Sequence, residues 1–219
     1  MTEQAGGEFI PREALERRLT ALAERNAKTL PLFAARCALR AFPLLAIPED
    51  FAFWPEQERT LNLLAVWRAL MLALSGEWMP AQIATGAQRA AAAARGFLAG
   101  GEGSALQGEV LKWSTLVAVA EQVARMGTAP GLSGGEQVAL AISVAETVHP
   151  FLLHLAGENT TAVVLQDLDQ CESRGAEIVQ TAPLWLGLTP SPRLVELAFE
   201  RLPQQLQLRA KSESPQDSQ

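Results

Sequence analysis

Two histidines are the side chains best suited to acid–base or metal chemistry in this sequence. His149 and His154 are its only histidines, and they lie five residues apart. On a helix this spacing separates them by roughly 140°, whereas two histidines that bind one metal from a single helix prefer a spacing of four residues. Pro150 lies between them and disturbs the helix further. A structural role for both rings is therefore the favoured interpretation.

An acidic run follows the histidines and offers carboxylates that could hold a cation. Its members are Asp167, Asp169, Glu172 and Glu177. Such a run is usually a solvated helix face, and we expect one here. The alternative is an enzyme, or a binder of a small ligand or metal, with a site between helices near His149, His154 and Asp167. Convergence of these groups in one pocket would favour this alternative.

One segment resembles a nucleotide-contacting motif. Residues 132–136, Leu-Ser-Gly-Gly-Glu, are nearly the signature with which an ABC-type ATPase contacts nucleotide on a partner subunit. Such an enzyme also needs a Gly-x-x-x-x-Gly-Lys-Ser/Thr loop, whose backbone and lysine hold the phosphates, and the sequence contains no such loop. Ser133 and Glu136 instead have the spacing of a capping box, which starts a helix. The segment therefore predicts a helix start and no ATPase.

Five tryptophans and no tyrosine make the indole side chains the next candidates. Most of them are expected in the core, because an indole fills the space between helices, but an exposed one would mark a binding surface. Trp54 and Trp185 lie in proline-rich connections and are the predicted partner-binding residues. Phe51 and Phe53 lie beside Trp54 and are expected to join this anchor, in a segment that folds back onto the core.

Composition argues against several functional classes. Hydrophobic residues make up 48% of the 219 residues, which is enough to bury a core. The net charge is −6, and basic residues form no run, so we expect no nucleic-acid partner. The longest uncharged stretch, 178–192, holds 15 residues, fewer than the roughly 20 apolar residues of a membrane span. Cys37, a predicted core residue, and Cys171 form no CxxC pattern, which favours a reduced, cytoplasmic protein.

Apolar residues recur with helical spacing through most of the chain. No convincing strand pattern appears, so we predict an all-α bundle or array of about seven helices with irregular Pro-rich connections. The expected helices lie around residues 15–22, 32–42, 63–75, 80–98, 110–127, 134–156, 160–172 and 192–202. Leu63, Trp67, Leu70 and Leu74 form an apolar stripe on the third of them. We expect one domain over residues 1–207, or two lobes at 1–126 and 128–207, followed by a disordered polar tail at 208–219.

Four successive segments share a recognisable order of helix types. They are "LFAARCALRAFPLL" (32–45), "AVWRALMLALSGE" (65–77), "AQRAAAAARG" (87–96) and "LVAVAEQVARMG" (116–127). Over residues 30–126 this order resembles a bacterial alanine-rich helical module found in immunity proteins of polymorphic toxin systems. The histidines common in the last helix of such modules are absent here. The resemblance implies a protein that works by binding another protein.

These observations lead to one favoured function and two alternatives. We expect a non-enzymatic helical interaction or adaptor protein, with no cofactor or metal, whose acidic surface attracts a basic protein partner. The resemblance adds a role in toxin immunity or a related conflict system. The alternatives are the enzyme or ligand binder described above and a subunit of an obligate oligomer. An oligomer subunit would show a large exposed apolar surface on the isolated chain.

Overall fold

The computed structural model describes residues 10–46, 54–75, 79–100, 106–128, 132–156 and 160–174, together with Pro192, Glu196 and Glu200. Within these ranges seven α-helices pack together and no strand occurs, which confirms the all-α prediction. The helices are α1 (Arg12–Arg25), α2 (Thr29–Ala41), α3 (Arg59–Ser75), α4 (Ala81–Gly100), α5 (Leu106–Gly127), α6 (Gly134–Ala156) and α7 (Thr160–Arg174). Two short 3₁₀ helices, η1 (Phe42–Ala46) and η3 (Glu56–Glu58), flank the connection between α2 and α3.

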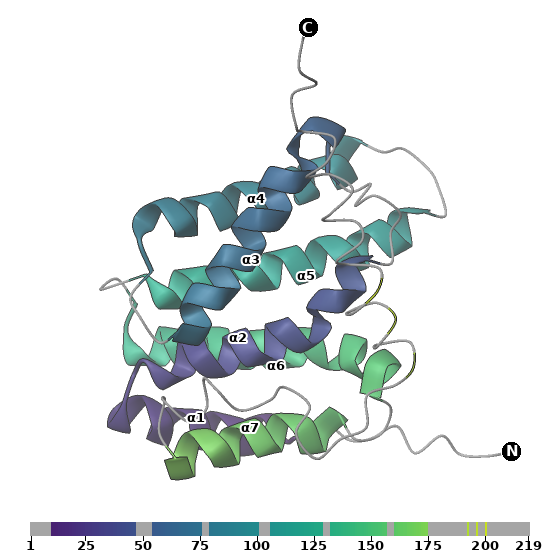
Figure 1. Cartoon of the computed structure of the whole chain (residues 1–219). Helices are drawn as coiled ribbons and strands as arrows, with labels where there is room; N and C mark the ends of the chain where they lie inside the picture. Colours follow the sequence, from purple (N-terminus) through teal and green to yellow (C-terminus); the bar gives the residue numbers. More distant parts are fainter. Residues whose placement is uncertain are drawn as a thin grey trace, which may run out of the picture.

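Helix α2 is the centre of the bundle. All thirteen of its residues are buried, and it packs against α3, α5, α6 and α7. Figure 1 shows α1 and α7 side by side at one end of the molecule and α3, α4 and α5 grouped at the other. Because α2 has no solvent-facing side, every polar side chain on it must find its partner inside the protein.

Helix α1 is amphipathic, as its leucine spacing predicts. Leu15, Leu19 and Leu22 are buried, and the helix lies on α6 and α2. Pro11 precedes the first helical residue, and its carbonyl accepts hydrogen bonds from the N–H groups of Ala14 and Leu15 at 2.9 and 3.1 Å. Because its leucines face the bundle, α1 keeps its polar face on the outside.

Helix α4 packs on α5 and α3 through alanine. Its buried residues within 81–95 are all alanines, namely Ala84, Ala87, Ala90, Ala91 and Ala94. Alanine favours helix and lets a neighbouring backbone approach closely. The alanine-rich composition that identified this helix in the sequence therefore also explains how it packs.

The capping box predicted at the start of α6 is present. The backbone N–H of Ser133 donates to the Glu136 carboxylate at 2.7 Å, and the N–H of Glu136 donates to Ser133 Oγ at 3.3 Å. These two bonds satisfy groups that a helix start would otherwise leave without partners. Pro150 lies inside α6, which continues past it to Ala156.

Buried apolar residues form one cluster to which all seven helices contribute, from Ile10 to Cys171. The segment 160–165, whose β-branched residues also suit a strand, is helical as predicted. Helix α5 begins at Leu106, earlier than the start expected around residue 110. The final helix expected around 192–202 and the tail at 208–219 lie outside the continuously described ranges.

Candidate functional site

Asp167 is the most deeply buried charged group among the described residues. It has no exposed surface, and its Oδ1 accepts hydrogen bonds from Arg36 Nε and Arg40 Nη2, each at 2.9 Å. Its Oδ2 accepts a further bond from Arg40 Nη1. Both arginines are only 1% exposed, so the three residues form a buried ion cluster between α2 and α7. We refer to Arg36, Arg40 and Asp167 as the ion cluster.

The ion cluster corrects one expectation and reveals two unexpected residues. Asp167 was expected on a solvated face. It lies instead on the inner face of α7, together with the buried side chains of Val164 and Leu168. Arg36 and Arg40 lie four residues apart on an otherwise apolar helix, so they face the same side. Two arginines at this spacing in an apolar helix were the sequence signal for a buried acidic partner.

Of the three groups named for an interhelical catalytic or metal site, the structure describes the side chains of His149 and Asp167. Asp167 is bonded to arginines, and neither it nor His149 lines either of the surface hollows described below. Burial lowers the pKa of His149, and the side chain of His154 lies outside the described residues. Within the described ranges, no three His, Cys, Asp or Glu side chains gather closely enough to hold a metal ion.

Both cysteines are free and buried near the ion cluster. Burial is the main cause that raises the pKa of Cys37, and burial likewise raises the pKa of Cys171 to about 12. Such thiols stay protonated at neutral pH and react slowly. Cys37 is thus a core residue, as predicted.

Trp54 is buried, whereas its predicted role as a binding anchor depended on an exposed indole. Its indole has no accessible surface, and Nε1 donates a hydrogen bond to the Ala90 carbonyl at 2.9 Å. The prediction that it folds back onto the core is confirmed. Phe51, Phe53 and Trp185, the other three predicted partner-binding residues, lie outside the described residues.

The exposed apolar surface lies on α3 instead. Among the described residues, the large hydrophobic side chains that remain exposed are Leu61, Trp67 and Met71, at 69%, 41% and 40%. The core-facing side of α3 uses other residues, among them Leu63, Val66 and Leu70. Trp67 of the predicted stripe therefore lies at the edge of the core-facing side, partly covered and partly exposed. The reason is that α3 is apolar on nearly all sides, so periodicity alone does not select its buried face.

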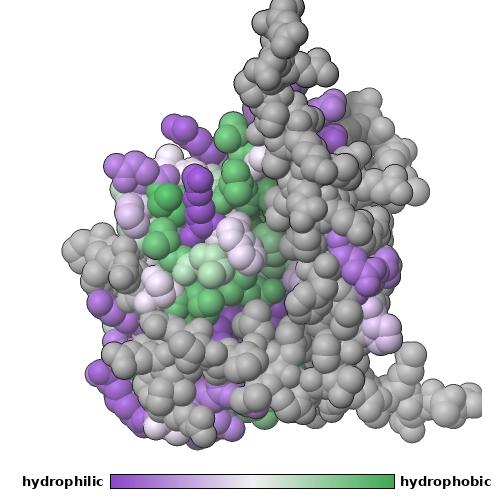
Figure 2. Space-filling view, viewed as in Figure 1, coloured by the Kyte–Doolittle hydropathy of each residue, from purple (hydrophilic) through white to green (hydrophobic). Residues whose placement is uncertain are grey.

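Trp67 and Met71 belong to a continuous face of α3. Leu64 and Leu74 are half-buried, and the spacing 64, 67, 71, 74 places these four side chains on one side of the helix. We name these four residues the α3 face. Figure 2 shows hydrophobic side chains gathered where α3 crosses the visible surface, with hydrophilic side chains above and to the left of them. Phe42 contacts Trp67 with ring centroids 5.2 Å apart, which supports the indole from below.

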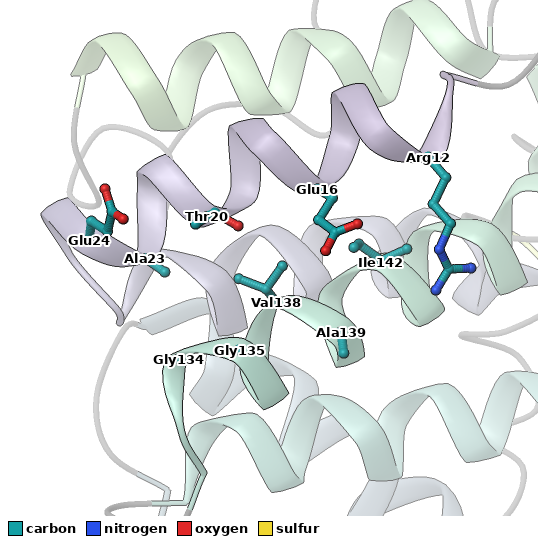
Figure 3. A pocket seen from close by; sticks show the side chains of 10 residues that line it. All are labelled: Arg12, Glu16, Thr20, Ala23, Glu24, Gly134, Gly135, Val138, Ala139 and Ile142. Atoms are coloured by element: carbon teal, nitrogen blue, oxygen red, sulfur yellow. The ribbon is translucent and has the colours of Figure 1, made fainter.

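A second surface feature lies between α1 and α6. It is a groove with a volume of about 430 Å³, lined on the α1 side by charged and polar residues and on the α6 side by small and apolar ones. Figure 3 shows Glu16 and Arg12 extending from α1 toward α6, with Val138 and Ile142 between the two helices. We name this feature the α1/α6 groove. It is formed by α1 and α6, so it is separate from the α3 face.

Charged contacts fasten α7 beside α1. Arg18 donates to Glu172 Oε1 and Oε2 at 2.8 and 2.7 Å and to Asp169 Oδ1 at 2.6 Å. The hydrogen bond to Glu172 is the largest cause that raises the pKa of Arg18. Arg25 reaches the Glu172 carbonyl at 3.5 Å. Asp169 and Glu172, two further members of the acidic run, thus hold α7 against α1. Glu177, the last member of the run, lies outside the described residues.

Comparison with known proteins assigns no family to this chain. No family model, no curated protein and no solved structure matches it. None of the helices in the described ranges is both long enough and apolar enough to cross a bilayer. The resemblance of residues 30–126 to an immunity-protein module stays a prediction, and function has to be argued from the surfaces themselves.

Proposed function

We propose that this chain is a non-enzymatic helical interaction protein that binds another protein through the α3 face. The observation that carries the proposal is an exposed tryptophan, Trp67, beside an exposed methionine on a helix with few charges. Aromatic residues, methionine and arginine are enriched in interface cores relative to other surfaces. Arg68 is exposed on the same helix, so all three of these residue types occur on the surface of α3.

The arrangement of Trp67 favours tight binding. Phe42 is 5% exposed and its ring lies at 50° to the indole, so Trp67 has less rotational freedom than a free surface side chain. A side chain that is already ordered loses less conformational entropy on binding. Tryptophan is also over-represented among the few residues that dominate binding energy. Trp67 is therefore the proposed anchor.

Site-specific crosslinking tests this proposal. A photoreactive phenylalanine analogue replaces Met71 in cells that express the full chain, and a matched variant carries it at Ala92, an exposed residue of α4. We expect a discrete crosslinked partner from position 71 and none from position 92. The same bands from both positions, or none from either, would contradict an interface on the α3 face.

A second copy of this chain is the other occupant that the α3 face supports. An exposed apolar surface on an isolated chain is the feature expected of an oligomer subunit. The crosslinking experiment separates the two cases, because a product of twice the chain mass identifies self-association. A product of any other mass identifies a different protein, and the immunity role predicts that this protein is a toxin.

The cellular setting that we propose is the cytoplasm. Cys37 and Cys171 are free thiols among the described residues, and disulfides are rare in reducing compartments. The supporting observation is the burial of both thiols away from solvent. Reaction of the purified protein with a thiol reagent, before and after unfolding, checks that both remain reduced.

A further inference from the structure

The α1/α6 groove has a floor and a rim of different chemistry. Val138 and Ile142 lie at its base and are 5% and 2% exposed, and Ala139 and Ala23 flank them. The outer edge is formed by α1, from which Glu16 and Glu24 line the groove. An apolar floor below a charged edge is the shape that receives one face of an amphipathic helix.

The rim of the groove carries a net negative charge when residues already engaged in ion pairs within the protein are left out. Arg12 is engaged by Glu146 at 3.0 Å, which leaves no net charge at that end of the groove. Glu16 and Glu24 are exposed and have no ion-pair partner among the described residues. A second hollow of about 610 Å³ over α1 shares both glutamates and adds Glu13 against a single arginine, Arg17.

Two glycines keep one end of the groove open. A Cβ atom built at Gly134 or at Gly135 meets no atom within 4 Å, so neither packing nor a close approach explains the absence of side chains. Both residues line the groove at the start of α6. On the α1 side the groove extends from Arg12 to Glu24, about 18 Å or three helical turns.

An anion is a poor occupant for the open end. The capping box already places the Glu136 carboxylate at the first turn of α6, where bonds from Ser133 lower its pKa. The two rim glutamates would repel a second negative group, while the net charge of −6 attracts positively charged partners over longer distances. The charge of the groove thus selects a basic occupant.

We propose that the α1/α6 groove binds a basic amphipathic helix of a partner protein, with aliphatic side chains on Val138 and Ile142 and Lys or Arg beside Glu16 and Glu24. The partner helix spans about three turns, the length of the groove. This site is separate from the α3 face and does not depend on the function proposed for it. A protein with both surfaces can hold two partners at once.

A pair of designed peptides tests the groove. Each peptide has about 14 residues, a helix of about 21 Å, and carries leucines on one face; one has lysines at the flanking positions and the other has glutamates. Both are labelled with fluorescein and titrated with the full chain at low and high salt. We expect binding of the lysine peptide, weakened by salt, and no binding of the glutamate peptide.

Three variants locate the binding. The double variant Glu16→Lys/Glu24→Lys and the variant Gly135→Leu should each weaken lysine-peptide binding about tenfold or more, which is about 1.4 kcal/mol. Gly135→Leu is chosen because its side chain enters open space, so the fold is retained. Glu58→Lys, an equally exposed charge reversal on η3, is the control and should leave the dissociation constant unchanged.

Several results would overturn the proposal. They are no binding of the lysine peptide, equal binding of both peptides, an equal effect of Glu58→Lys, and full binding by Gly135→Leu. Loss of binding in Trp67→Ala instead would assign the peptide to the α3 face. An unfolding midpoint measured in urea for every variant separates loss of binding from loss of fold.

Discussion

Helix α4 packs on α3 and α5 through alanine, whereas α7 adds ion pairs with arginines of α2 and α1 to its apolar contacts. The alanine contact is non-directional, and its strength depends on how closely the helices approach. The ionic contact is directional, and each charge in it depends on its partner. The first arrangement should therefore respond to side-chain volume, and the second to the removal of single charges.

The largest effect is expected from removing the shared carboxylate. Asp167→Ala leaves Arg36 and Arg40 buried without the group that binds both of them. Breaking a buried pair from one side costs about 3–5 kcal/mol, so we expect a loss of that size in the free energy of unfolding by urea. A loss below about 1 kcal/mol, the size of a surface pair, would show that α7 does not rely on the ion cluster.

An apolar replacement of the whole ion cluster sharpens this test. Replacing all members of a buried ion cluster by apolar residues of similar size is often neutral or stabilising. We therefore expect Arg36→Met/Arg40→Met/Asp167→Leu to be much more stable than Asp167→Ala alone. A triple variant no more stable than the single one would mean that the charges are needed for reasons other than mutual compensation.

A volume change should affect the alanine contact next. Ala91 on α4 is fully buried, and Ala91→Leu forces extra methylene groups into a close helix contact. Overpacking of this kind costs about 1–3 kcal/mol, measured as a lower urea midpoint. We expect the cost to be the same at low and high salt, because no charge is involved. A cost that changes with salt would contradict an uncharged contact between α4 and its neighbours.

The smallest effect is expected at the exposed end of the α7 contact. Arg18→Ala removes bonds to Asp169 and Glu172, and Asp169 is 69% exposed. Exposed pairs contribute about 0.2–1 kcal/mol, and added salt should reduce the difference between variant and wild type. A cost as large as that of Asp167→Ala, unchanged by salt, would place the main attachment of α7 at Arg18 instead.

Local sequence patterns predicted the helices well because their signals are local. The leucine spacing of α1, the alanines of α4 and the box of Ser133 with Glu136 each depend on residues within a few turns. The same local signals explain why a helix starts at residues 132–136, as predicted. Such features can be predicted from one sequence because no distant residue decides them.

The surfaces were predicted poorly because distant residues decide them. Trp54 lies in a proline-rich connection, but the carbonyl of Ala90 on α4 receives its indole N–H. Asp167 lies in an acidic run, but arginines more than 120 positions earlier bury it. Trp67 belongs to a helix that is apolar on nearly all sides, so the neighbours of α3 determine which face stays exposed.

The dissociation constant of the protein crosslinked through Met71 tests the central claim most directly. It would be measured by calorimetry for wild type, for Trp67→Ala and for the control Arg89→Ala, which changes an exposed residue of α4. Loss of a dominant interface residue costs about 2 kcal/mol or more. We predict about 30-fold weaker binding for Trp67→Ala and an unchanged affinity for Arg89→Ala, with both variants shown to be folded by a cooperative urea transition. Equal affinity of Trp67→Ala and wild type would contradict an interface built on the α3 face.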